Sequence, residues 1–291
     1  MTNNTIKNNN VIISTESACE LPQDIIEKYD IRIITVPYYL DGEEKTFSNM
    51  TMNELYQHMA NGQRLSTSQI NEFEYMNHFE NLLKENKQIV HIGFSSGLSG
   101  MFNSAMLSLE KIDKHDRENI FIIDTKTGSL ALGILVEIAC QMAQDGASAN
   151  EIVTMIEEMK NHVSAIITAN ELKYLRLSGR ISKISAYLGS LLSIKPIFKV
   201  SHKDGKFEAV SKVLSRKKSL VELLNYFKNN YDNYGDSTIY ISHANCFEDA
   251  QFLQNGISSL YPDVKVRILE FGAIIGGHSG PGTIAIFFTS K

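Results

Sequence analysis

The chain has 291 residues, 43% of them hydrophobic and 21% charged, which is typical of a globular protein with one large or two medium cores. Its net charge of −5 argues against a general nucleic-acid-binding protein, which usually carries a basic stripe. The polar first ten residues do not form a signal peptide, and the most apolar stretch, residues 128–143, is shorter than the roughly 20 residues that span a bilayer. We therefore expect a soluble, cytoplasmic protein with three reduced cysteines.

The first half of the chain predicts strands that alternate with helices. The expected strands are residues 11–14, 31–40, 88–93 and 119–124, and the expected helices are 22–29, 51–61, 71–85, 100–112, 128–143 and 149–163. Such alternation indicates parallel βαβ construction, in which ligands bind beyond the carboxyl ends of the strands. We predict an N-terminal α/β domain over residues 11–160.

Beyond about residue 163 the predicted order is mixed. The expected strands are residues 165–168, 194–200, 207–213 and 237–242, and the expected helices are 171–175, 184–192, 214–229 and 246–260. Asp204-Gly205 predicts a hairpin turn, and Val264 to Phe288 predicts a closing strand-turn-strand hairpin. These elements predict a second, mixed α/β domain over residues 161–291.

Three turns rich in hydroxyl groups and glycine carry the candidate binding residues. The first is Ser66–Gln69, and the second, Gly93–Gly100, follows a strand and opens a helix, where backbone N–H groups are free to bind an anion. The third, Gly276–Gly282, places four glycines and a proline around His278. Each turn alone is compatible with an ordinary helix cap or a tight hairpin with a surface histidine, but the three together favour an anion site.

A serine hydrolase is the main alternative. Gly93-Phe94-Ser95-Ser96-Gly97 matches the Gly-x-Ser-x-Gly nucleophile elbow, and Asp124 and His278 follow in hydrolase order. However, no His-Gly-Gly-Gly segment precedes it, Asp124 follows only one crossover later, and His278 leads into a strand. Asp124 could hold a metal, but a cap for the next helix is favoured. No nucleotide-binding loop, carboxylate cluster or metal-ligand spacing of histidines is present.

Six short motifs, in order from Val11 to Phe288, resemble the DegV family of bacterial fatty acid-binding proteins. They are Glu16–Pro22, Thr67-Ser68-Gln69, Ser95–Gly100, Ser178-Gly179-Arg180-Ile181, Ile194–Ile197 and Gly277–Gly282. Glu16, Ala18 and Glu20 stand where the family has Asp, Thr and Asp, and Ile70 replaces a usual proline. These departures concern the N-terminal loop rather than the pocket.

The resemblance implies a two-domain DegV-like α/β fold with one long-chain fatty acid between the domains. It implies a carrier rather than an enzyme: a separate fatty acid kinase phosphorylates the bound carboxylate to acyl phosphate for phospholipid synthesis. The carboxylate-binding residues that it implies are Thr67, Ser68, Ser95 or Ser96, and His278, with Arg180 in support. By its sequence context alone, Arg180 is compatible with either a surface position or a polar pocket. No cofactor, metal or nucleic acid is implied, and a transient membrane contact during ligand loading is compatible with the resemblance.

Physical chemistry is consistent with this interpretation. Burying roughly 14 CH₂ groups of a fatty acid tail, at about 0.8 kcal/mol each, contributes on the order of 10 kcal/mol of favourable binding free energy. Burying the carboxylate is unfavourable unless hydroxyl, imidazole and N–H groups donate hydrogen bonds to it. The basic residues Lys199, Lys203, Arg216, Lys217 and Lys218 give a further hypothesis, a docking surface for the kinase, although solvated surface side chains are the favoured explanation.

Overall fold

A computed structural model describes residues 10–45, 50–181, 194–234 and 237–291. Contacts divide these residues into two compact units: residues up to Val36 together with Gln69–Asn161, and Pro37–Ser68 together with His162–Lys291. The sequence places residues 37–68 with the N-terminal half, whereas their contacts are with the C-terminal residues. The helix expected over residues 184–192 lies outside the described residues.

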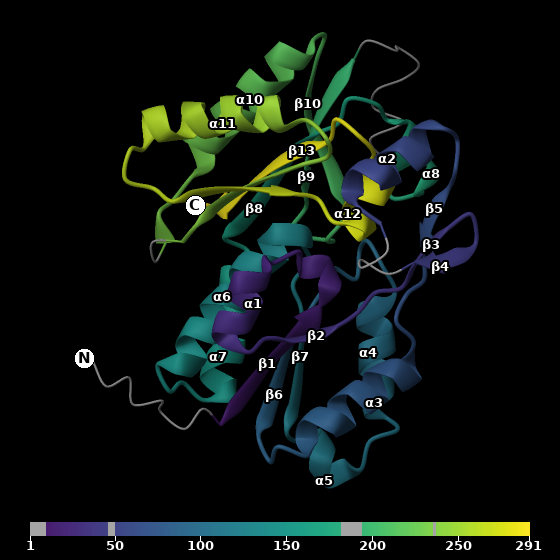
Figure 1. The fold of residues 1–291 in the computed structure, drawn as a ribbon. Helices are drawn as coiled ribbons and strands as arrows, with labels where there is room; N and C mark the ends of the chain where they lie inside the picture. Colours follow the sequence, from purple (N-terminus) through teal and green to yellow (C-terminus); the bar gives the residue numbers. More distant parts are fainter. Residues whose placement is uncertain (1–9, 46–49, 182–193, 235–236) are drawn as a thin grey trace. The chain divides into compact units, whose positions relative to one another are not determined.

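The first unit is built on a parallel sheet in the order β2-β1-β6-β7. Its strands are β1 (Val11–Glu16), β2 (Arg32–Ile34), β6 (Gln88–Gly93) and β7 (Ile120–Asp124). Its helices are the 3₁₀ turn Ser17–Cys19, α1 (Gln23–Tyr29), α3 (Glu72–Leu83), α4 (Met101–Leu109), α5 (Lys114–Arg117), α6 (Ser129–Gln144) and α7 (Ala149–Met159). Helices α6 and α7 contact one face of the sheet and α3 and α4 the other (Figure 1). Because both faces are covered, β1 is buried along its whole length, which explains its run of apolar residues.

The second unit contains two sheets, a mixed one in the order β10-β9-β8-β13-β11-β12 and a small antiparallel one in the order β4-β3-β5. Its strands are β3 (Tyr38–Leu40), β4 (Glu43–Lys45), β5 (Leu65–Thr67), β8 (Val163–Thr168), β9 (Lys195–Val200), β10 (Phe207–Val213), β11 (Ile239–His243), β12 (Val266–Glu270) and β13 (Ile284–Thr289). Its helices are α2 (Met52–Ala60), α8 (Lys173–Leu177), α10 (Arg216–Asn230), α11 (Phe247–Leu260) and α12 (Ala273–Ser279).

Helices α10 and α11 lie side by side over one face of the large sheet (Figure 1). A fully buried core forms there, with Leu223 and Phe227 of α10 against Ile241 of β11 and Phe288 of β13. Asp204-Gly205 lies between the antiparallel strands β9 and β10, so the hairpin predicted there is confirmed.

The closing hairpin expected between Val264 and Phe288 is wrong. Strand β11 lies between β12 and β13, and residues Ala273–Ser279 form a helix instead of a tight turn. Glycine fits this helix because a neighbouring side chain packs directly against the helix backbone. A Cβ atom on Gly277 would lie 2.3 Å from Cδ2 of Leu65. The N–H groups of Gly276 and Gly280 bond within this helix, to Gly272 O and Gly276 O, so these two are not free to bind an anion.

The strand expected over residues 31–40 is two strands in different sheets. Strand β2 pairs with β1 in the first unit, and β3 pairs with β4 and β5 in the second. The break falls at Val36-Pro37, where the proline has no N–H group to continue a ladder. At this point the chain passes from one compact unit to the other.

Candidate functional site

Thr67 and His278 come together in the second unit although 211 positions separate them in the sequence. Oγ1 of Thr67, at the end of β5, lies 2.8 Å from Nε2 of His278, near the end of α12. Close packing of Gly277 against Leu65 lets α12 approach β5 near enough for this hydrogen bond. We call these two residues the Thr67–His278 pair.

A pocket of about 320 Å³ opens at the Thr67–His278 pair. Arg64, Lys173 and Arg180 line it together with the pair, and none of the described lining residues is acidic. Serine hydroxyl groups from residues 66 and 178 add further hydrogen-bonding capacity. This cationic pocket therefore has the chemistry of an anion-binding site.

Burial, and to a smaller extent the positive charge of Arg180, lower the pKa of His278 to about 4. Near pH 7 the imidazole is therefore neutral. If Nε2–H donates to Thr67, the threonine hydroxyl donates outward; if Thr67 donates to Nε2, then Nδ1–H remains as the donor. In either tautomer the pair keeps one proton to donate to a bound acceptor.

The other residues implied for the second unit lie as follows. Arg180 is exposed and lines the cationic pocket, and its Nη1 donates to Ser178 O at 2.8 Å. Ser68 is half-buried, and its N–H donates to Pro37 O at 3.2 Å. Ser68 is not among the described residues that line the pocket, whereas Thr67 is.

Ser95 and Ser96 belong to the first unit, in a segment we call the serine turn (residues 93–97). Ser95 is fully buried, and its Oγ accepts a hydrogen bond from Gly97 N–H at 3.1 Å. Ser96 is exposed, and its Oγ accepts from Lys126 Nζ at 2.7 Å. A role for either hydroxyl in binding the same ligand as the Thr67–His278 pair stays a prediction.

Asp124 is held by a lysine. Its carboxylate lies 2.5 Å from Lys126 Nζ and accepts from Ser96 N–H at 3.1 Å. Burial acts to raise the pKa of Asp124, but these contacts hold it below its ordinary value. The helix cap favoured from sequence is wrong, because α6 begins after Gly128. This arrangement gives no support to Asp124 as the acid of a hydrolase triad.

Arg64 and Lys173 are pocket residues that sequence reasoning missed. Neither belongs to a motif, and the only available signal was closeness in the chain to Thr67 and Arg180. Over the described part of the chain, no group of three or more His, Cys, Asp or Glu side chains could hold a metal ion. Over the same part, no helix has the length and apolar character needed to cross a bilayer.

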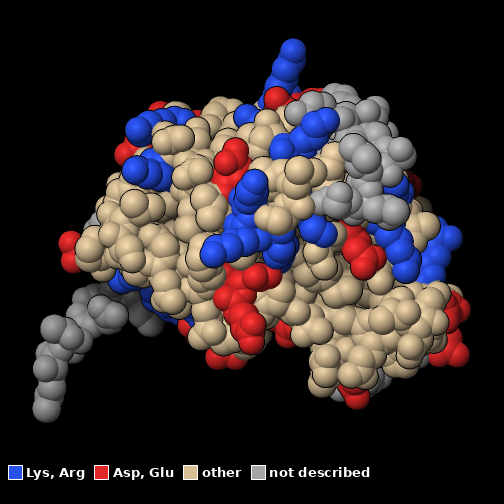
Figure 2. Space-filling model, turned by 90° about the horizontal axis from the view of Figure 1, so that it is seen from above, with Lys and Arg blue, Asp and Glu red and all other residues tan. Residues whose placement is uncertain are grey.

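The proposed docking residues lie on a surface of mixed charge. Arg216 pairs with Asp249 at 2.8 Å, and Lys199 lies 3.9 Å from Glu208. In the view from above, basic and acidic side chains lie beside one another (Figure 2). The docking hypothesis stays a prediction.

Comparisons with known proteins agree over nearly the whole chain. The family model described as "Uncharacterised protein, DegV family" matches residues 10–291. A DegV domain-containing protein of Clostridium perfringens is 37% identical over 281 residues, which cover 95% of this chain and 96% of the relative.

Solved structures give the same result. A fatty acid binding DegV family protein from Streptococcus agalactiae matches with a TM-score of 0.85 and 27% identity, over 97% of this chain and 99% of the other. DegV of Bacillus subtilis, a fatty acid binding protein, matches with a TM-score of 0.84 and 27% identity, over the same shares of the two chains. These matches confirm the α/β fold with a parallel N-terminal sheet and a mixed C-terminal one.

Proposed function

The chain belongs to the DegV family, and on that premise we propose that it binds a long-chain fatty acid whose carboxylate meets the Thr67–His278 pair. The observation that carries the proposal is the 2.8 Å contact between Thr67 and His278 in a pocket lined by three basic side chains. Fatty acid binding by relatives from Streptococcus agalactiae and Bacillus subtilis supports it.

The energetics of a fatty acid suit such a site. The tail would lie in the apolar interior, where each buried CH₂ contributes about 0.8 kcal/mol. The carboxylate would keep hydrogen bonds from the one outward proton of the Thr67–His278 pair and from Ser95 or Ser96, with Arg180 in support. Because His278 is neutral near pH 7, the positive charge would come from the basic side chains.

We further propose that the protein is a carrier and not an enzyme. A separate fatty acid kinase would phosphorylate the bound carboxylate to acyl phosphate, which feeds phospholipid synthesis. The three basic residues Arg64, Lys173 and Arg180 support this step, because they supply more positive charge than one carboxylate balances. An acyl phosphate carries more negative charge than the fatty acid and would be stabilised by the same side chains.

We expect the purified protein to carry a fatty acid, which denaturing extraction and mass spectrometry would identify. Thr67→Val and His278→Ala each break the hydrogen bond that positions the outward proton of the Thr67–His278 pair, so fatty acid affinity should fall about 10- to 100-fold in each variant. Turnover by an added fatty acid kinase should fall in parallel.

Thr154→Val is the matched control, because this exposed threonine of α7 donates to Asn150 O of its own helix and lies outside the pocket. Its affinity and turnover should equal those of the wild type. A protein that comes out empty and takes up neither oleate nor palmitate would contradict the proposal. Covalent labelling of Ser95 by a fluorophosphonate would then favour the alternative of a serine hydrolase.

A further inference from the structure

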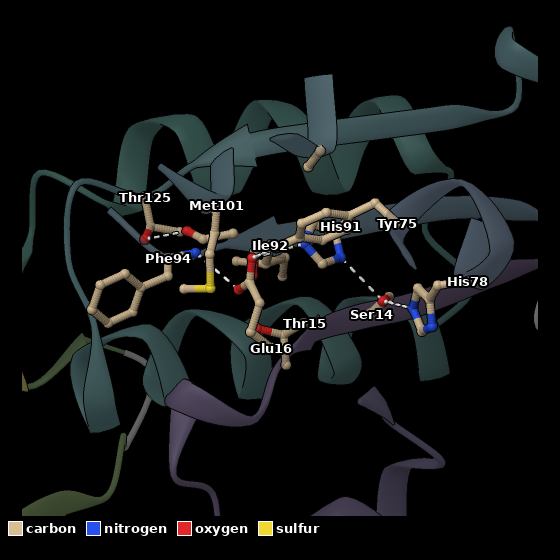
Figure 3. A network of polar contacts seen from close by, with 12 residues as sticks. Ser14, Thr15, Glu16, Tyr75, His78, His91, Ile92, Phe94, Met101 and Thr125 are labelled. Atoms are coloured by element: carbon tan, nitrogen blue, oxygen red, sulfur yellow. Dashed lines mark hydrogen bonds and ion pairs between the residues drawn. The ribbon is translucent and has the colours of Figure 1, made fainter. Parts of the chain in front are cut away.

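A buried polar network in the first unit has no part in the contacts proposed so far. Glu16 on β1 is fully buried, and Oε1 accepts from Tyr75 Oη at 2.7 Å and from His91 Nε2 at 3.1 Å. Its other oxygen, Oε2, accepts from the backbone N–H of Phe94 at 3.0 Å (Figure 3). Both carboxylate oxygens are therefore used.

The network continues from His91 toward the half-buried His78. Nδ1 of His91 lies 3.1 Å from Oγ of Ser14, and the same Oγ lies 2.8 Å from Nε2 of His78 (Figure 3). Because an ionised Glu16 can only accept, Nε2 of His91 must donate to it. The hydroxyl group of Ser14 then links His78 to His91, and His91 donates to Glu16.

Glu16 is held as an anion by this arrangement. Burial by itself raises the pKa of a carboxyl group, but the electrostatic effect of His91 and the hydrogen bonds from His91, Tyr75 and Phe94 bring the pKa of Glu16 below its ordinary value. Burial lowers the pKa of His78 to about 4, so this end of the chain is neutral near pH 7. We call Ser14, Glu16, Tyr75, His78 and His91 the glutamate network.

The glutamate network reaches the serine turn directly. Phe94, whose N–H is bound by Glu16, immediately precedes Ser95. The neighbouring backbone groups are bound as well: Gly93 O accepts from Thr125 Oγ1 at 2.8 Å, and Ser95 N–H donates to Thr127 O at 2.8 Å. Among these three residues that bond to the serine turn, Glu16 is the one on β1. It therefore connects the turn to an inner strand of the sheet.

We propose that Glu16 is a positioning residue that fixes the backbone at Phe94 and thereby the place of the Ser95 hydroxyl. The effect on ligand binding rests on the proposed function, because it requires Ser95 to meet the fatty acid carboxylate. Glu16 acts through the turn and does not touch the ligand. The aromatic rings of Tyr75 and Phe79 lie edge-on to His91, at 5.6 and 5.4 Å between centroids, and pack against the imidazole.

Glutamine at position 16 distinguishes hydrogen bonding from charge. Its amide oxygen accepts from Phe94 N–H, and its NH₂ group donates to Tyr75 and to Nε2 of His91. Nε2 of His91 must then accept and cannot carry the proton that it donates to Glu16 in the wild type. Leucine has a similar volume but leaves Phe94 N–H without an acceptor.

The test compares Glu16→Gln and Glu16→Leu with the exposed control Glu27→Gln on α1. In Glu16→Gln we expect imidazole ¹⁵N spectra to show that Nε2 of His91, protonated in the wild type, has lost its proton. The Phe94 amide should stay protected from hydrogen exchange, and oleate affinity should stay within about threefold of the wild type. In Glu16→Leu, Phe94 exchange should accelerate at least tenfold, and oleate affinity should fall about tenfold.

An unchanged His91 tautomer in Glu16→Gln, or a protected Phe94 amide in a folded Glu16→Leu, would overturn the proposal. If Glu16→Leu does not fold, the imidazole spectra and the Phe94 exchange rate of Glu16→Gln still test whether Glu16 holds His91 and Phe94. A wild type that binds no oleate contradicts the proposed function, whereas these two readouts test Glu16 without ligand. Oleate binding that survives Ser95→Ala but not Thr67→Val would overturn the link from Glu16 to the ligand and leave fatty acid binding intact.

Discussion

His278 is a half-buried imidazole whose close partner is a hydroxyl group, and this combination decides its protonation. Burial and the charge of Arg180 bring the pKa of His278 from about 6.5 down to about 4. The side chain is therefore a neutral hydrogen-bonding group near pH 7 and contributes no charge of its own. A neutral histidine binds a ligand through hydrogen bonds and leaves the positive charge to the basic residues around it, whereas an imidazolium would itself form an ion pair with the ligand.

This low pKa predicts a pH dependence of stability. In the unfolded chain His278 takes up a proton near pH 6.5, whereas in the folded chain it does so only near pH 4. The unfolded state thus binds more protons between these values, and the free energy of unfolding falls as the pH is lowered through this window. His278→Gln should remove about 1 to 3 kcal/mol of that fall, as measured by urea unfolding at pH 7 and pH 4.5.

Titration of His78 also lowers the free energy of unfolding as the pH falls through this window. In His278→Gln, the dependence of this free energy on pH should therefore become weaker without vanishing. A variant with the wild-type slope would show that His278 titrates equally in both states, contrary to its burial.

Helix α12 is the element that assembles the candidate site. Its apolar first turn and two adjacent glycines allow contact with β5, α2 and α8. Gly276 approaches Tyr56 of α2, and Gly277 approaches Leu65 of β5, each with 2.3 Å between the place of a Cβ and the nearest atom. The glycines that suggested an anion-binding turn therefore act through close packing of a helix.

Gly277→Ala should destabilise the protein and weaken ligand binding together. The added methyl group overlaps Leu65 and displaces β5, which carries Thr67. Overpacking of this kind costs about 1–3 kcal/mol, which exceeds the roughly 1 kcal/mol that alanine gains over glycine in a helix. Urea unfolding and oleate titration would measure the two effects.

The double variant Gly277→Ala with Leu65→Ala is the control, because it removes the overlapping side chain. Its loss of stability should be smaller than the sum of the two single losses. If the two losses of stability simply add, the contact between Gly277 and Leu65 is not the cause of the destabilisation by Gly277→Ala.

At the scale of the whole molecule, a segment from the first third of the chain belongs with the C-terminal residues. Residues 37–68 supply the small sheet and α2 to the second unit, and with them Thr67. The chain then returns to the first unit at Gln69, and α3 follows with a capping box formed by Asn71 and Glu74. The two connections at Val36-Pro37 and Ser68-Gln69 are thus the links between the units in this part of the chain.

Native-state hydrogen exchange should follow this division. We expect the amides of β3 and β5 to exchange with the same denaturant dependence as those of β8 and β13, because they open with the second unit. The amides of β1 and β6 should form a separate set. Exchange of β3 and β5 together with β1 would contradict the assignment of residues 37–68 to the second unit.

The sequence by itself determined the elements whose pattern is local. Strands β1, β6 and β7, most of the helices and the β9–β10 hairpin follow from apolar periodicity and turn residues, which act over a few positions. Thr67, Arg180 and His278, which short motifs indicate as carboxylate-binding residues, line the same pocket, and their role in binding stays a prediction. These motifs did not identify Arg64 or Lys173, whose place in the pocket depends on how distant elements pack.

Only the tertiary structure decided which elements pair. It split the strand expected over residues 31–40 between two sheets, placed β11 between β12 and β13, and made a helix of the expected closing turn. It also showed that Glu16, a departure from a family motif that sequence reasoning assigned to a loop, is a buried carboxylate holding the serine turn. The physical reason is that β pairing, close packing of glycine and burial of a charge depend on partners distant in the sequence, which local patterns do not encode.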